Sequence, residues 1–116
     1  MIMNMVQALN SALDVMLEKN PEVLIFGEDV GYFGGVFRVT DKLQKKHGHH
    51  RCFDSPISEG GIIATGIGMA AEGLRPVVEI QFAAYILLAY EQLVSEAARI
   101  RHRSKSDVRA RITALA

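Results

Sequence analysis

The chain has 116 residues, which allows one domain with a core of modest size. Thirteen basic and thirteen acidic residues cancel, so the composition indicates neither a nucleic-acid-binding protein nor one attracted to anionic membranes. The single cysteine, Cys52, cannot form an internal disulfide bond, the N-terminus shows no signal-peptide pattern, and no apolar run approaches the ~20 residues of a membrane-spanning helix.

The first predicted element is an amphipathic helix over residues 4–19. Apolar residues recur there at spacings of three and four, Asn4 and Gln7 resemble a capping box, and Asn20–Pro21 ends the pattern. Residues 23–26 (VLIF) are apolar on both faces, which predicts a strand of a parallel sheet that is covered on both sides.

A glycine-rich loop over residues 27–35 follows this strand and contains Glu28 and Asp29. Glycines beyond the carboxyl end of a strand can let a phosphate approach the backbone, but more often they only form a turn, and we favour the turn. A short polar helix is predicted over residues 40–46.

Residues 47–50 (HGHH) raise the question of a zinc site, but no cysteine or carboxylate completes a known ligand spacing, so a turn is the simpler interpretation. A short strand is predicted over residues 51–53. Cys52 within it is interpreted as a small core residue, because no activating base is near it in the sequence.

The acid Glu59 stands at the start of the next predicted helix, over residues 58–72. Pro56 keeps the preceding residue extended, and Ser58 can cap the helix. Glu59 therefore falls in the first turn of an otherwise apolar helix, where the helix dipole favours its anion and the apolar surroundings favour its neutral form. It is either a proton-handling residue or a residue that only helps the helix start, and on this pattern alone the second interpretation is simpler.

Small residues form one face of this helix (Gly61, Ala64, Gly68 and Ala71). This face predicts close contact with a neighbouring helix, either within the same subunit or across a subunit boundary. Residues 66–71 also match GxGxxA, but that dinucleotide fingerprint requires a strand directly before the first glycine. The match is therefore interpreted as accidental. A stand-alone nucleotide-binding protein, which would depend on this match, is kept as a minor alternative. A buried strand over 76–80, a long helix over 83–103 and a weak strand over 108–114 complete the chain.

Several strings resemble the beta subunit of thiamine-diphosphate-dependent 2-oxo acid dehydrogenases, the decarboxylating component of the branched-chain 2-oxo acid and pyruvate dehydrogenase complexes. They are residues 27–31 (GEDVG), 34–38 (GGVFR), 54–62 (DSPISEGGI), 73–82 (GLRPVVEIQF), 95–99 (SEAAR) and 101–104 (RHRS). The strings share one uninterrupted register over nearly the whole chain. With this resemblance, Glu59 is interpreted as a catalytic residue rather than as one that only helps the helix start.

The resemblance implies an α/β fold with a parallel sheet flanked by helices, the transketolase-like, pyrimidine-binding fold of thiamine-diphosphate enzymes, in truncated form. In that family the acid matching Glu59 hydrogen-bonds a ring nitrogen of the aminopyrimidine and favours the imino tautomer, which removes the thiazolium proton. Loss of this proton generates the thiazolium ylid. The ylid attacks the carbonyl carbon of the 2-oxo acid, and carbon dioxide then leaves. Positions matching Ile57, Gln81 and Tyr85 line the same pocket, and Glu28 matches an acid behind it.

The same resemblance implies that thiamine diphosphate is shared with an alpha subunit, which is expected to hold the magnesium ion, so no metal site is expected on this chain. The expected assembly contains two alpha and two beta subunits and passes its acyl group to a lipoyl-bearing acyltransferase core. It needs no nucleic acid or membrane, and it belongs in the bacterial cytoplasm or the mitochondrial matrix.

Family members are much longer, so residues 1–116 are interpreted as an incomplete pyrimidine-binding module, inactive as an isolated fragment, without its C-terminal part and second domain. A non-catalytic fragment that only associates with an alpha subunit remains the alternative. Tyr32–Phe33 favours a branched-chain substrate over pyruvate or acetoin. The family pattern has an acid at Ala84 and a proline at or beside Leu88, so the segment after Gln81 is expected to differ.

Overall fold

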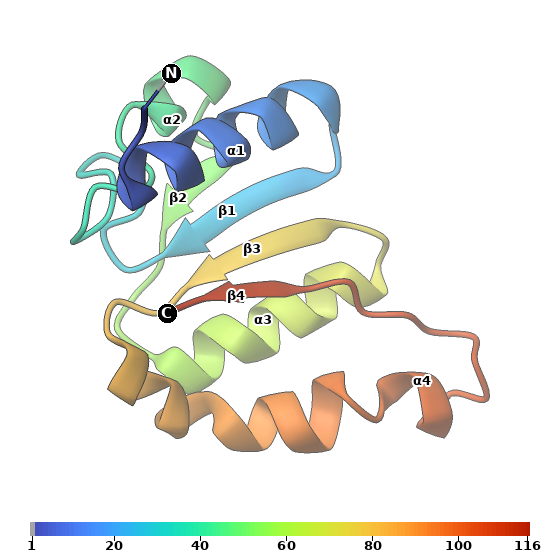
Figure 1. Ribbon diagram of the computed structural model, residues 1–116. Helices are drawn as coiled ribbons and strands as arrows, with labels where there is room; N and C mark the ends of the chain where they lie inside the picture. Colours follow the sequence, from blue (N-terminus) through green and yellow to red (C-terminus); the bar gives the residue numbers. More distant parts are fainter. Residues whose placement is uncertain (1) are drawn as a thin grey trace.

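Four short parallel strands form the centre of the molecule and lie in the order β2-β1-β3-β4 (Figure 1). The computed structural model describes residues 2–116. The strands are β1 (Val23–Gly27), β2 (Cys52–Asp54), β3 (Arg75–Glu79) and β4 (Thr113–Leu115). Because all four are parallel, the segments that leave β1, β2 and β3 emerge at one edge of the sheet, where ligands bind in open α/β folds. The predicted fold class is confirmed.

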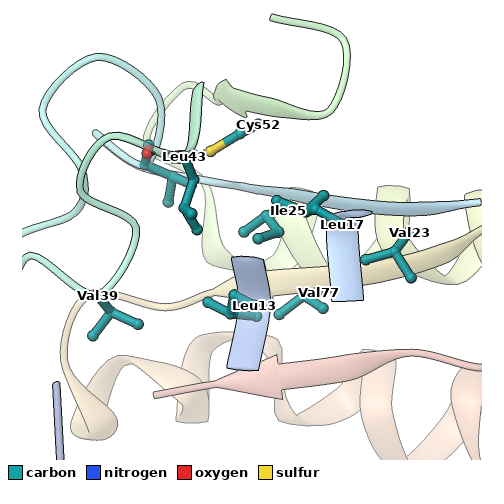
Figure 2. Packing of buried hydrophobic residues seen from close by; sticks show 9 residues of the cluster. Leu13, Leu17, Val23, Ile25, Val39, Leu43, Cys52 and Val77 are labelled. Atoms are coloured by element: carbon teal, nitrogen blue, oxygen red, sulfur yellow. Dashed lines mark hydrogen bonds between the residues drawn. The ribbon is translucent and has the colours of Figure 1, made fainter. Parts of the chain in front are cut away.

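One face of the sheet is covered by α1 (Met5–Lys19) and α2 (Leu43–His47). The predicted capping box begins α1: the Gln7 amide donates to Asn4 Oδ1 at 2.9 Å, and the Asn4 amide donates to Gln7 Oε1 at 3.0 Å. Leu17 of α1 lies beside Val23 and Ile25 of β1, and Leu13 of α1 lies beside Val77 of β3, as Figure 2 shows. The alternation of strand side chains places Val77, and therefore Glu79, on this same face.

The opposite face is covered by α3 (Glu59–Ala71) and by the segment that follows β3. Ser58 caps α3 as predicted, with its Oγ accepting a hydrogen bond from the Gly61 amide at 3.3 Å. The second core cluster lies here, and it consists of Leu24, Phe26, Ile62, Ile63, Ile67, Val78, Ile80 and Ala89. The crossover from β2 through α3 to β3 thus places the first turn of α3 beside the carboxyl ends of the strands.

The prediction of one long helix over residues 83–103 is wrong. The segment begins as a 3₁₀ helix, η1 (Ala83–Ala89), continues as a π-helix, η2 (Gln92–Ala97), and ends in a short α4 (Ile100–Arg103). Its sequence contains no glycine or proline from which these changes of helix type could be predicted. The apolar spacing indicated which side chains face the core, but the three helix types differ only in hydrogen-bond offset, and tertiary contacts decide among them.

Two other predicted elements are shorter in the structure. The helix predicted over 40–46 begins only at Leu43, because Lys42 has a φ of 65° and Thr40 is held by its own hydrogen bond, from Oγ1 to the Val30 carbonyl at 2.7 Å. The strand predicted over 108–114 is limited to Thr113–Leu115. None of the helices in residues 2–116 combines the length and apolar character that a membrane span requires.

Small residues of α3 point in two different directions. Gly61, Ala64 and Gly68 are exposed, so their predicted partner helix is not found within residues 2–116 and their contact role stays a prediction. Gly66 instead faces the sheet, where an added Cβ would lie 2.8 Å from Val78 Cγ1. Gly66 also sits inside the helix rather than after a strand, so the structural context of a dinucleotide fingerprint is absent there.

A candidate cofactor site at the carboxyl edge of the sheet

Polar side chains gather where β1, β2 and β3 end. Glu28 and Asp29 follow β1, Glu59 begins α3 after the loop that leaves β2, and Gln81 lies two residues beyond β3. Because the strands are parallel and adjacent, residues distant in the sequence meet at this edge. The structure therefore brings the predicted acid, its supporting acid and the predicted glutamine to one region.

Glu28 and Glu59 form an acidic pair on the α3 side of the sheet. Glu28 is only 7% exposed, whereas Glu59 in the first turn of α3 is half-buried. Burial raises the pKa of the Glu28 carboxyl, and the nearby charges of Glu59 and then Asp29 raise this pKa further. Burial and the like charges beside it therefore both favour the neutral form of the Glu28 carboxyl.

Asp29 and Gln81 are in contact at the same edge of the sheet. Asp29 adopts a φ of 57°, and its Oδ2 accepts a hydrogen bond from Gln81 Nε2 at 3.3 Å. The Asp29 carbonyl accepts a second hydrogen bond, from the Gly35 amide at 2.8 Å. This contact orients the Gln81 side chain, and it was not predicted, because Asp29 and Gln81 are 52 residues apart in the sequence.

Aromatic rings extend from this edge towards the solvent. Tyr85, in η1, makes an edge-to-face contact with Phe82 at a centroid distance of 5.4 Å, and Phe82 makes a similar contact with Phe37 at 5.7 Å. Tyr85 is 45% exposed, so part of its ring remains open to a flat ligand. Ile57 lies in the loop between β2 and α3 and is 82% exposed, so no contact within the described chain holds its side chain at the site.

The glycine-rich loop does not form a cradle for phosphate. Gly34 and Gly35 have φ values of 80° and 81°, and an added Cβ on Gly35 would lie 3.0 Å from Glu79 Oε2. The loop thus closes over a carboxyl group, which favours the turn interpretation over phosphate binding at this point. The neighbouring histidine stretch contributes a structural contact instead, from His47 Nε2 to Asp14 Oδ1 at 2.6 Å.

No group of three or more potential metal ligands comes together within residues 2–116. Cys52 is buried in the core as predicted, and burial, then the charges of Asp54 and Glu79, raises the pKa of its thiol to about 12. Two acids near the site, Asp29 and Glu79, were missed as contributors. Glu79 did leave a signal in the sequence, since it is a charged residue inside an otherwise apolar strand.

Comparison with known proteins gives one family match. The family described as "Transketolase, pyrimidine binding domain" matches residues 2–113. The similar curated proteins include the 2-oxoisovalerate dehydrogenase subunit beta of Pseudomonas aeruginosa, 64% identical over 105 residues, which are 90% of this chain and 30% of that protein.

Two further relatives show the same pattern. The pyruvate dehydrogenase E1 component subunit beta of Acholeplasma laidlawii is 49% identical over 106 residues, 91% of this chain and 32% of that protein. The mitochondrial 2-oxoisovalerate dehydrogenase subunit beta of Chaetomium thermophilum is 55% identical over 101 residues, 87% of this chain and 21% of that protein. The chain thus spans less than a third of the length of each of these relatives.

Proposed function

Since this chain belongs to the transketolase pyrimidine-binding domain family, we propose that it is the pyrimidine-binding part of a 2-oxo acid dehydrogenase beta subunit. The observation that carries the proposal is the position of Glu59, in the first turn of α3 beside the buried acid Glu28. The relatives named as beta subunits of 2-oxoisovalerate and pyruvate dehydrogenases support it. Identity is higher to the first than to the second, 64% against 49%, which favours a branched-chain 2-oxo acid.

The residues at the carboxyl edge fit the aminopyrimidine end of thiamine diphosphate. A carboxyl group at Glu59 can share a proton with a ring nitrogen, and the raised pKa of Glu28 favours the uncharged form of this neighbouring acid. Thiamine diphosphate, when bound, supplies the electron sink for decarboxylation of a 2-oxo acid. The role of Glu59 is therefore to hold a proton at one atom of the pyrimidine ring.

The other predicted residues would orient and shield the ring. The half-exposed Tyr85 offers an aromatic face or edge, and Gln81, oriented by Asp29, offers an amide at the end of β3. Ile57 offers apolar surface in the loop just before α3. With the ring bound, these apolar groups would exclude water from it, which would strengthen the hydrogen bond between the ring nitrogen and Glu59.

The rest of the assembly follows the same proposal. An alpha subunit would share thiamine diphosphate and hold its magnesium ion and diphosphate, in an assembly of two alpha and two beta subunits. The acyl group would pass to a lipoyl-bearing acyltransferase core. The compartment would be the cytoplasm of a bacterium or the mitochondrial matrix. The exposed small-residue face of α3 is a candidate contact between subunits.

The test is Glu59→Gln in the full-length protein assembled with its partner subunit. Gln keeps the shape of the side chain but cannot take up the ring proton, so decarboxylation and exchange of the thiazolium proton should fall by about 10²–10⁴-fold. Glu28→Gln should cost less, because Glu28 acts through Glu59. Initial rates with branched-chain 2-oxo acids and with pyruvate would settle the substrate preference.

Glu72→Gln is the matched control. It makes the same chemical change at the exposed C-terminal end of the same helix and should leave the exchange rate unchanged. If Glu59→Gln exchanges the thiazolium proton at the rate of the Glu72→Gln control, Glu59 is only a helix-starting residue and the proposed role is wrong.

A further inference from the structure

Glu79, the last residue of β3, is a buried acid that the proposed mechanism does not use. The residue is 7% exposed, and its Oε2 has no hydrogen-bond partner within the described part of the chain. β3 lies between β1 and β4, so the backbone of Glu79 is fixed on both sides. A carboxyl group held in this way without a partner costs free energy, so its presence requires a structural or functional explanation.

Two glycines give the Glu79 side chain its space. Gly27 is its ladder partner on β1, where an added Cβ would lie 2.5 Å from the Glu79 carbonyl oxygen and 3.1 Å from its Cβ. Gly35 lies over the carboxyl group, where an added Cβ would be 3.0 Å from Oε2 and 3.2 Å from Oε1. The glycine-rich loop therefore rests directly on this carboxyl group, and a side chain at Gly35, whose φ is 81°, would be strained and would press on the carboxyl oxygens.

The surroundings of Glu79 favour an uncharged group. From β2, Cys52 and Asp54 face the same side of the sheet, and β4 presents the apolar Leu115. The ion pairs that form within residues 2–116 do not involve Glu79; their basic members are Lys46, His47, Arg75 and Arg103. Burial raises the pKa of the Glu79 carboxyl above its ordinary value.

A chain of contacts leads from Glu79 to the candidate cofactor site. Above the carboxyl group, the Gly35 amide donates to the Asp29 carbonyl at 2.8 Å. The Asp29 carboxylate in turn accepts the hydrogen bond from Gln81 Nε2 at 3.3 Å. These two hydrogen bonds connect the loop that covers Glu79 to Asp29 and, through Asp29, to Gln81.

We propose that Glu79 is a positioning residue: as an uncharged carboxylic acid it supports the glycine-rich loop at Gly35 and thereby holds Asp29 against Gln81. Ionisation would place an unsolvated charge beneath Gly35 and release the loop. The sign follows from the raised folded-state pKa: the support is complete below the unfolded value of 4.5 and is lost as the pH rises through the folded value. The loop contact stands on this chain alone, while its effect on cofactor binding rests on the proposed function.

The first arm of the test measures hydrogen exchange of the Gly35 amide in the full-length protein without cofactor, from acidic to alkaline pH. After correction for intrinsic exchange, protection in the wild-type protein should fall as Glu79 ionises. In Glu79→Gln, which is uncharged at every pH, protection should not depend on pH. A wild-type profile without a pH-dependent loss, or the same loss in Glu79→Gln, would overturn the proposal, and the wild-type profile decides even if the variant fails to fold.

The second arm measures the thiamine diphosphate Kd by titration calorimetry of the assembled protein, at a pH below the loss of protection found in the first arm. Glu79→Gln should bind like wild type, whereas Glu79→Ala, which removes the support, should bind about tenfold more weakly, equivalent to about 1.4 kcal/mol. Equal Kd values for Glu79→Ala and wild type would refute the link to the site. Because the first arm contains no cofactor, failure of the proposed function would leave its result intact, and the two failures are distinguishable.

Discussion

Gly66 and Gly68 provide a matched pair of substitutions that tests how α3 lies on the sheet. Both are interior residues of the same helix, so Ala at either position gains about 1 kcal/mol of helix propensity over Gly. Their surroundings differ. An added Cβ at Gly68 meets nothing within 4 Å, whereas at Gly66 it would lie 2.8 Å from both Val78 Cγ1 and Ile112 Cδ1.

The two contacts at Gly66 are not equally easy to relieve. Ile112 Cδ1 is the end of a flexible, partly buried side chain and can move aside. Val78 is fully buried on β3, which is paired with a strand on each side, so its methyl group has no free space to occupy. Overfilling a core of this kind costs about 1–3 kcal/mol.

We therefore expect Gly68→Ala to raise the free energy of unfolding by about 0.5–1 kcal/mol. Gly66→Ala gains the same propensity but loses it to the clash, so it should be less stable than Gly68→Ala by about 1–3 kcal/mol. Urea unfolding of the 116-residue chain, followed by circular dichroism with m-values compared, measures both. Equal stabilisation by the two substitutions would show that Gly66 does not face β3, and the described arrangement of α3 on the sheet would be wrong.

Two further predictions concern the α1 side of the molecule. Arg51 donates from Nε to the Val23 carbonyl at 2.7 Å and from Nη2 to the carbonyls of Leu17 and Asn20, so Arg51→Lys should cost about 1.5–3 kcal/mol in urea unfolding. Arg75→Lys, at a half-exposed ion pair with Glu22, is the control and should change stability by less than about 1 kcal/mol; equal losses would contradict the bridging role of Arg51. Because burial raises the pKa of the Cys52 thiol to about 12, a thiol reagent at mildly alkaline pH should label Cys52 only after denaturation, and fast labelling of the folded chain would contradict its burial.

Local interactions are the part of this structure that the sequence determined by itself. The capping box of Asn4 and Gln7 and the cap at Ser58 involve residues three positions apart, so the signals lie next to each other in the chain. The apolar run of residues 23–26 predicted a strand covered on both faces, and β1 is buried along its whole length. The same locality placed Glu59 in the first turn of α3, while its interpretation as a catalytic acid came from the family resemblance of the surrounding strings.

Tertiary structure decided the features that depend on distant partners. The winding of residues 83–103 changes from 3₁₀ to π without any sequence signal, because helix types of nearly equal energy are selected by contacts with other elements. The contact between Asp29 and Gln81 joins residues 52 positions apart, and it exists only because β1 and β3 are neighbours in the sheet. The burial of Glu79 beneath Gly35 has the same origin: the sequence shows an acidic residue in an apolar strand, but only the strand order and the course of the loop remove its carboxyl group from water.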